Sequence, residues 1–191
     1  FHFVKGDVRD RALLRELMGP GDLVGHRPPV TSVLHLAGRV GVRRVLQDPA
    51  GCQGENLDGA QAVAEVLEEL QVRGAATPRV VAASTSEVYG ESRAPMSEFS
   101  PLRPLDARGR WRYAASKLKS ESLLQDAVHL RFFNVVGPGQ DAGSGMVLPR
   151  FIEAARVGEP LRVHGSGAQV RTLAHVGQVA QDVAALAAPE A

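Results

Sequence analysis

The sequence predicts an α/β protein with a parallel sheet and helices on both faces. Short apolar runs alternate with segments of helical periodicity along most of the 191 residues. The runs expected to form strands are residues 1–5, 31–38, 79–84 and 128–133. Because a predicted helix separates each run from the next, the strands should run in the same direction.

The predicted helices are marked by apolar residues at core spacing. The first has Leu13, Leu14, Leu17 and Met18 on one face. The helix expected over 56–71 has Val63, Val66, Leu67 and Leu70 at the same spacing. Three further helices are expected over 112–125, 147–157 and 176–187, with loops over 19–29 and 91–110.

One junction is unusually short. Only Asp126 and Ala127 separate the helix predicted to end at Gln125 from the strand predicted to begin at Val128. A connection between a helix and a parallel strand normally has about 2–6 residues, and the helix must also cross the sheet. We therefore expect residues to be missing at this junction.

The composition is that of an ordinary soluble globular protein, with 44% hydrophobic and 23% charged residues. A net charge of +1 provides no basic field for nucleic acid. No apolar stretch approaches the length of about 20 residues that a membrane-spanning helix needs. Cys52 is the single cysteine, which fits a cytoplasmic location, and the six histidines show no metal-ligand spacing. We therefore expect no nucleic-acid partner, no membrane partner and no metal site.

Small and polar residues follow several predicted strands. They are Asp7, the segment 36–39, the cluster Ser84–Glu87 within "STSEVYG", and Asn134. Ligands of open parallel sheets bind beyond the carboxyl ends of the strands. We therefore expect these residues to line one ligand-binding edge.

A tyrosine and a lysine stand four residues apart in "RWRYAASKLKSE". Tyr113 and Lys117 lie on the same face if this segment is helical. A nearby ammonium favours the phenolate and should lower the pKa of Tyr113, which starts near 10. Tyr113 is therefore predicted to act as a base near neutral pH.

Seven motifs in order make the chain similar to the extended short-chain dehydrogenase/reductases, the nucleotide-sugar epimerase/dehydratase family. The motifs are "GDVRD", "VLHLAG", "NLDG", "ASTSEVYG", "YAASK", "RFFNVVGP" and "GSGAQVRTLAHV". The resemblance implies a Rossmann-like, doubly wound parallel sheet. Residues 1–135 would form the dinucleotide-binding domain without its first glycine-loop unit, and 136–191 a partial substrate lobe whose end returns to the sheet.

The resemblance also implies roles for individual residues. The catalytic group would be Thr85, Tyr113, Lys117 and Glu87. NAD, with NADP not excluded, would contact Asp7, Val8, Leu36, Ala37, Gly38, Asn56, Ser84, Tyr113, Lys117 and Phe133. The nucleotide-diphosphate sugar, expected to be UDP-linked, would contact Thr85, Ser86, Glu87, Asn134, Val147 and Arg171.

The reaction implied is oxidation of sugar C4 to a 4-keto intermediate, with three possible endings. C4 epimerisation of a UDP-hexose or UDP-uronate is the first expectation, followed by decarboxylation of UDP-glucuronate and by 4,6-dehydration. Ser86 stands where glucose-type dehydratases carry an Asp, which argues against that mechanism. Glu87 is shared with decarboxylases and mannose-type dehydratases, and an epimerase also tolerates it.

The chain departs from the family pattern in two places. No GxxGxxG motif follows a strand, so we expect the chain to be part of a longer protein. Gln178 stands near the position of a usual Asp. The alternative class is a non-catalytic Rossmann binding module, although the retained Thr85, Tyr113 and Lys117 argue against it. The family resemblance also implies a homodimer through two helices of each subunit.

Overall fold

The computed structural model describes residues 2–19, 29–91, 95–103, 111–141, 143 and 145–188. In chain order its elements are α1 (Arg11–Met18), β1 (Ser32–His35), α2 (Val42–Gln47), α3 (Pro49–Val72), β2 (Arg79–Thr85), the 3-10 turn η1 (Ser86–Tyr89), α4 (Trp111–Leu123), β3 (Val128–Phe132), β4 (Asn134–Val136), α5 (Val147–Arg156), β5 (Leu173–His175) and α6 (Val176–Ala187). Much of the two loops predicted over 19–29 and 91–110 lies outside the described residues.

A parallel sheet forms the centre, as the sequence predicts. Its strand order is β1-β2-β3, with Ser32 opposite Arg79 and Val81 opposite Val128. A second, two-stranded parallel sheet joins β4 to β5. Because all three central strands run in one direction, their carboxyl ends meet at one edge.

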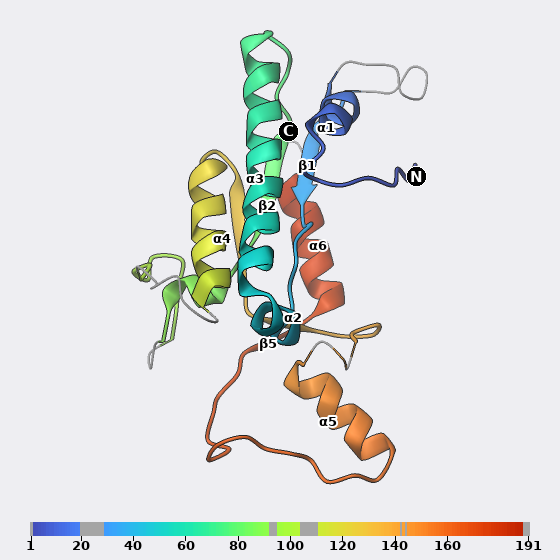
Figure 1. The fold of residues 1–191 in the computed structure, drawn as a ribbon, viewed down its shortest axis with the longest axis vertical. Coiled ribbons are helices and arrows are strands. Elements are labelled where there is room, and N and C mark those ends of the chain that lie inside the picture. The colour runs from blue at the N-terminus through green and yellow to red at the C-terminus, as the bar shows by residue number, and fades with distance from the viewer. Residues whose placement is uncertain are drawn as a thin grey trace.

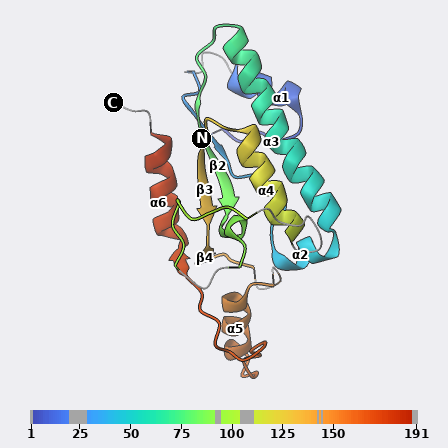
Figure 2. The ribbon, with the colours of Figure 1, turned by 90° about the vertical axis from the view of Figure 1, so that its left-hand side faces the viewer.

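Helices cover both faces of the central sheet. Helices α3 and α4 lie side by side on one face, and α6 packs on β1 and β2 from the other (Figures 1 and 2). The hydroxyl of Ser32 on β1 donates to the carbonyl of Ala187 at the end of α6. Helix α5 lies beyond the carboxyl ends of the strands (Figure 2). The division into residues 1–135 and 136–191 stays a prediction.

Helix α3 begins seven residues before the predicted start at residue 56. Asp48 caps it by accepting a hydrogen bond from the backbone N–H of Gly51, and Pro49 occupies the first turn, where it costs no hydrogen bond. The glycines in this first part, including Gly54, hide the helical pattern from a sequence reading. The early start matters because it brings Glu55 and Asn56 onto a rigid element.

The core lies between α3 and the sheet. Val63 and Ala60 pack with Ala82 of β2 in one buried cluster, and Val66 packs with Leu70 in a second. Met18 of α1 joins the second cluster. Burial of these side chains fixes α3 along the strands, so the positions of its polar residues at the sheet edge follow from the packing.

The strand predicted over residues 1–5 is wrong for residues 2–5, which have no regular structure. A strand needs a neighbour for its backbone hydrogen bonds, and neither described sheet pairs with this segment. Phe3 is correspondingly exposed. Apolar β-branched or aromatic runs indicate strands only where a partner strand is available.

The connection between α4 and β3 is longer than the two residues that the sequence predicts. Helix α4 ends at Leu123 rather than Gln125, which leaves residues 124–127 for the connection. The backbone N–H of Ala127 donates to the carbonyl of Leu124 at 3.0 Å, forming a tight turn. Four residues fall within the usual range of helix-to-strand connections.

We expect Val66→Ala to lower the free energy of unfolding by about 2 kcal/mol, because it leaves a cavity at a fully buried site. The matched control is Val72→Ala on the same helix, where the side chain is 81% exposed and the change should stay within about 0.5 kcal/mol. Urea unfolding of both variants measures the difference. Equal losses would contradict the described core.

Candidate active site

The predicted catalytic turn follows β2 directly. Thr85, the last residue of β2, is buried, and its Oγ1 accepts a hydrogen bond from the backbone N–H of Glu87 at 3.3 Å. Ser86 begins η1, and the Glu87 side chain is exposed. The turn ends at Gly90, whose φ of 69° favours glycine. The strand end and its glycine therefore present Thr85, Ser86 and Glu87 at the carboxyl edge of the sheet.

Helix α4 places the predicted base and lysine beside this turn. Tyr113 and Lys117 are one helical turn apart, and α4 packs against both β2 and η1. Lys117 is buried, and its Nζ donates to the carbonyl oxygen of Ala83 at 2.8 Å. This bond ties the middle of the helix to the strand that carries Thr85.

The loop after β1 reaches the same place. The Asn56 side chain accepts from the backbone N–H of Arg39 at 2.7 Å and donates to the Arg39 carbonyl at 3.1 Å. A Cβ placed on Gly38 would lie 3.0 Å from Asn56 Oδ1 and 3.6 Å from Lys117 Nζ. Gly38, Asn56 and Lys117 are thus brought together, while Leu36 and Ala37 stay exposed on the loop.

Asp7 and Val8, both predicted to contact the cofactor, lie in the segment that precedes α1. Asp7 accepts three hydrogen bonds from Arg9, one from its backbone and two from its guanidinium, and these lower the pKa of Asp7 to about 2. Val8 packs against the helix at Gly59, where an added Cβ would lie 2.9 Å from Val8 Cγ1. His35 borders the same glycine.

The remaining predicted residues divide into two groups. Phe133 is exposed between β3 and β4, and Asn134 donates from Nδ2 to the carbonyl of Thr172 at 3.0 Å. Val147 is exposed at the start of α5, and Arg171 is exposed in a segment without regular structure. The structure therefore brings Asn134 to the second sheet but leaves Val147 and Arg171 on the surface.

The prediction that Lys117 lowers the pKa of Tyr113 is wrong for this structure. Burial and the negative charge of Glu87 raise the pKa of Tyr113 to about 12. Burial also lowers the pKa of Lys117, whose ammonium is directed at the Ala83 carbonyl. Tyr113 is consequently a neutral phenol here, and helical spacing alone did not reveal how the two groups are solvated.

His35 is a packed core histidine. It is 7% exposed on β1, and burial together with the charge of Lys117 lowers its pKa to about 4. Among the described residues, no group of three or more His, Cys, Asp or Glu side chains is placed to hold a metal ion.

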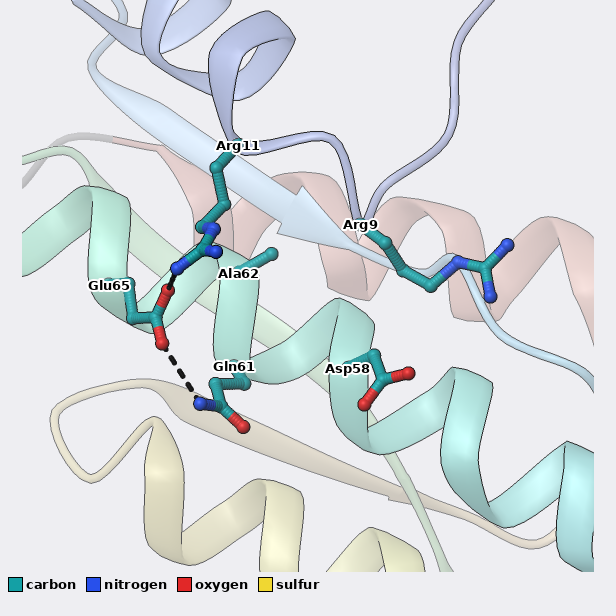
Figure 3. Close-up of a pocket in the computed structure, with 6 residues that line it drawn as sticks. All are labelled: Arg9, Arg11, Asp58, Gln61, Ala62 and Glu65. Atoms are coloured by element: carbon teal, nitrogen blue, oxygen red, sulfur yellow. Dashed lines mark hydrogen bonds and ion pairs between the residues drawn. The ribbon is translucent and has the colours of Figure 1, made fainter.

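Two cavities lie away from the predicted catalytic residues. A cavity of about 300 Å³ lies between the segment after residue 8 and α3, where Arg11 and Gln61 both bind Glu65 (Figure 3). Another, of about 290 Å³, borders β3 and includes Tyr89 and Arg131. Thr85, Tyr113 and Lys117 line neither of these two cavities.

Sequence reasoning missed two residues beneath the site. Glu121 accepts hydrogen bonds from Ser84 at 2.5 Å and from Arg131 at 2.7 and 3.1 Å. The hydroxyl of Ser84, predicted to contact the cofactor, is thus engaged with α4. The sequence did contain one indication of this role, because Glu121 follows Lys117 by four residues and therefore lies one helical turn further along the same face.

Comparison with known proteins now identifies the family. The sequence model of the NAD dependent epimerase/dehydratase family matches residues 1–191. The chain belongs to this family. It spans about half the length of the curated relatives it matches. No helix in the described ranges is both long and apolar enough to cross a membrane.

Three relatives illustrate the range of reactions. The chain is 32% identical over 183 residues to UDP-N-acetyl-alpha-D-glucosaminuronate decarboxylase from Bacillus cytotoxicus, covering 91% of this chain and 52% of that protein. The structure of UDP-glucuronic acid 4-epimerase from Bacillus cereus, with UDP-glucuronic acid and NAD, has a TM-score of 0.77 at 26% identity, covering 100% and 57%. The structure of dTDP-glucose 4,6-dehydratase from Streptomyces venezuelae, with NAD bound, has a TM-score of 0.76 at 30% sequence identity. The match covers 98% of this chain and 55% of that chain. These likenesses confirm the predicted family and Rossmann-type fold.

The described residues fit the family's dinucleotide. A Cβ at Gly38 would lie 3.0 Å from Asn56 Oδ1, which is tight, and 3.6 Å from Lys117 Nζ, which is ordinary contact. Gly38 is exposed and has no side chain, so a ligand at the carboxyl edge of the sheet can lie against its backbone. Lys117 and Asn56, which lie beside Gly38, would bind the cofactor at this edge of the sheet.

The lowered pKa of His35 predicts a loss of stability in acid. Below the ordinary pKa of 6.5 the unfolded chain binds a proton that the folded chain takes up only near pH 4. Stability contributed by neutral His35 is therefore present at pH 7 and declines as the pH falls, by about 2 kcal/mol between pH 7 and 5.

Urea unfolding of His35→Gln at both pH values should show a smaller loss than the wild type. The control, His164→Gln at an exposed site, should keep the wild-type dependence. An unchanged pH dependence in His35→Gln would contradict the assignment.

Proposed function

We propose that the protein oxidises C4 of a UDP-linked sugar with bound NAD and returns the hydride to the opposite face, giving net C4 epimerisation. The observation that carries this proposal is the convergence of Thr85, Tyr113 and Lys117 at the sheet edge where Gly38 approaches Lys117. The family relatives support it, since they include UDP-sugar 4-epimerases. A non-catalytic binding module would not need these side chains in one place.

The chain's own residues would perform the proton transfer. In its phenolate form, Tyr113 would accept the proton of the C4 hydroxyl as the C–H bond at C4 breaks, and it would return the proton when the ketone is reduced. Thr85 donates or accepts a hydrogen bond at the same hydroxyl and fixes its orientation. Lys117, whose Nζ donates to the Ala83 carbonyl, would hold the helix that carries Tyr113 against the strand that carries Thr85.

NAD, when bound, would accept and return the hydride of C4 and would bring a positive charge that favours ionised Tyr113. The exposed Leu36 and Ala37, together with Gly38, would line its binding edge. Asp7, Val8, Ser84 and Phe133 remain proposed contacts, as do Asn134, Val147 and Arg171 for the sugar nucleotide.

Decarboxylation is the second candidate. If C6 of the sugar is a carboxylate, the 4-keto intermediate is a β-keto acid, which loses carbon dioxide readily. Glu87 beside Tyr113 and the 32% identity to a UDP-sugar uronate decarboxylase favour this ending. Ser86 in place of an acid makes 4,6-dehydration less favourable, because no second carboxyl stands beside Thr85 to protonate a leaving hydroxyl.

A homodimer and a cytoplasmic location are part of the proposal. Helices α3 and α4 lie side by side on one face of the sheet, which supports a two-helix contact from each subunit. Cys52, the single cysteine of the sequence, is buried, which suits a reducing compartment.

Tyr113→Phe should lower kcat about 10²- to 10⁴-fold, because it removes the group that accepts the C4 proton while keeping the ring. NAD binding, measured by fluorescence, and the unfolding temperature should stay near the wild-type values. Turnover of UDP-sugars at the wild-type rate would refute the mechanism.

The ending of the reaction can be decided with UDP-glucuronate as substrate. An epimerase gives UDP-galacturonate at constant carbon content, which NMR of the sugar product detects. A decarboxylase releases one carbon dioxide per turnover, which a coupled assay detects. We expect the C4 epimer without carbon dioxide; stoichiometric carbon dioxide would replace our first assignment by the second.

A further inference from the structure

A partly buried ion pair joins α4 to β3 next to the candidate site. Arg131 Nη2 donates to Glu121 Oε2 at 2.7 Å, and Arg131 Nε donates to Oε1 at 3.1 Å, so the pair is bidentate. The two side chains are 21% and 10% exposed, whereas those of every other ion pair in the described ranges are at least 31% exposed. A pair buried in this way needs an explanation, because replacing such pairs by apolar residues often stabilises a protein.

The pair also binds both ends of the catalytic turn. Glu121 Oε1 accepts a hydrogen bond from Ser84, the residue before Thr85. Arg131 Nη1 donates to the Tyr89 hydroxyl at 3.1 Å, and its guanidinium carbon lies 5.2 Å from the centre of the Tyr89 ring. Ser84 and Tyr89 flank residues 85–88, so the ion pair brackets this segment from both sides.

Helix geometry connects the same pair to the proposed base. Glu121 follows Lys117 by four residues and Tyr113 by eight, so the three lie along one face of α4. Strand pairing adds a second link, because Arg131 stands directly opposite Ser84 in the β2–β3 register. One helix face therefore carries Tyr113 and also the carboxylate that holds the turn bearing Thr85.

We propose that Glu121 and Arg131 are positioning residues that fix the turn carrying Thr85 and Glu87 relative to Tyr113. This inference rests on the proposed function of the site. Lys117 fixes α4 at Ala83, and the guanidinium of Arg131 provides a second fixed point by donating to Tyr89 in η1. A bidentate pair fixes an orientation that an apolar contact would leave free.

The charge state required for this role is maintained at neutral pH. Burial would raise the pKa of Glu121, but hydrogen bonds from Arg131 and Ser84 outweigh it and lower the pKa on balance. The hydrogen bond to Glu121 raises the pKa of Arg131. Both groups thus stay ionised and keep their fixed geometry.

The first arm of the test needs no substrate. Glu121→Gln should raise amide hydrogen exchange of the peptide containing residues 84–90 about tenfold, because the turn loses its anchor and opens locally. Glu69→Gln is the matched control, since Glu69 accepts a bidentate pair from Arg15 at 2.5 and 2.8 Å far from the site. Unchanged exchange of this peptide in Glu121→Gln overturns the proposal.

The second arm measures turnover of the UDP-sugar that the wild type accepts. Glu121→Gln should lower kcat about 10- to 100-fold with KM within about twofold, because misplacement of reacting groups affects the chemical step. Arg131→Lys keeps the charge but loses the fork, so it should show the same pattern in a protein that folds. Glu69→Gln should keep the wild-type kcat.

The two arms distinguish the possible failures. A raised KM with unchanged kcat, or equal losses in Glu121→Gln and Glu69→Gln, overturns the positioning role. If the wild type turns over no UDP-sugar, the proposed function fails and the catalytic role of the pair fails with it. The exchange measurement then still shows separately whether the pair holds the turn.

Discussion

The hydrogen bond from Lys117 to the carbonyl of Ala83 is the interaction on which the site depends. It joins α4 to the strand that carries Thr85, two residues further along. A buried ammonium is costly unless its hydrogen bonds are made, so the helix cannot slide along the strand without losing this bond. The approach of Gly38 to the same nitrogen brings the loop after β1 to the same point. Helix α4, strand β2 and the loop after β1, which are distant in sequence, therefore meet at the Lys117 side chain.

Much of the architecture could be predicted from the sequence, because it depends on local patterns. The apolar run over 79–84 located β2, which spans Arg79–Thr85, and the periodicity over 56–71 located all but the first seven residues and the last residue of α3. The parallel direction of the strands followed from the alternation of helices and strands. The failures have different causes. Residues 2–5 lack a partner strand, which depends on contacts between segments that no local pattern encodes. Helix α4 ends at Leu123, where Ala127 forms a local turn with Leu124, and the helical periodicity alone did not mark that end.

The candidate site shows the same division. Thr85, Tyr113 and Lys117 were identified by motif and spacing, and the structure brings them to one edge. Glu121 and Arg131 were missed because their importance lies in contacts across elements. An acid on a helix and an arginine in a strand are ordinary surface residues until the β2–β3 register places Arg131 opposite Ser84.

Electrostatics at this edge favour neutral side chains in the structure described. Burial lowers the pKa of His35 and Lys117 and raises that of Tyr113, so each shift disfavours the charged form. Glu87 adds a negative charge that opposes ionisation of Tyr113 further. A phenol in these surroundings keeps its proton until positive charge arrives next to it. Under the proposed function, Tyr113 would therefore act as a base only once a cationic group lies beside it at this edge.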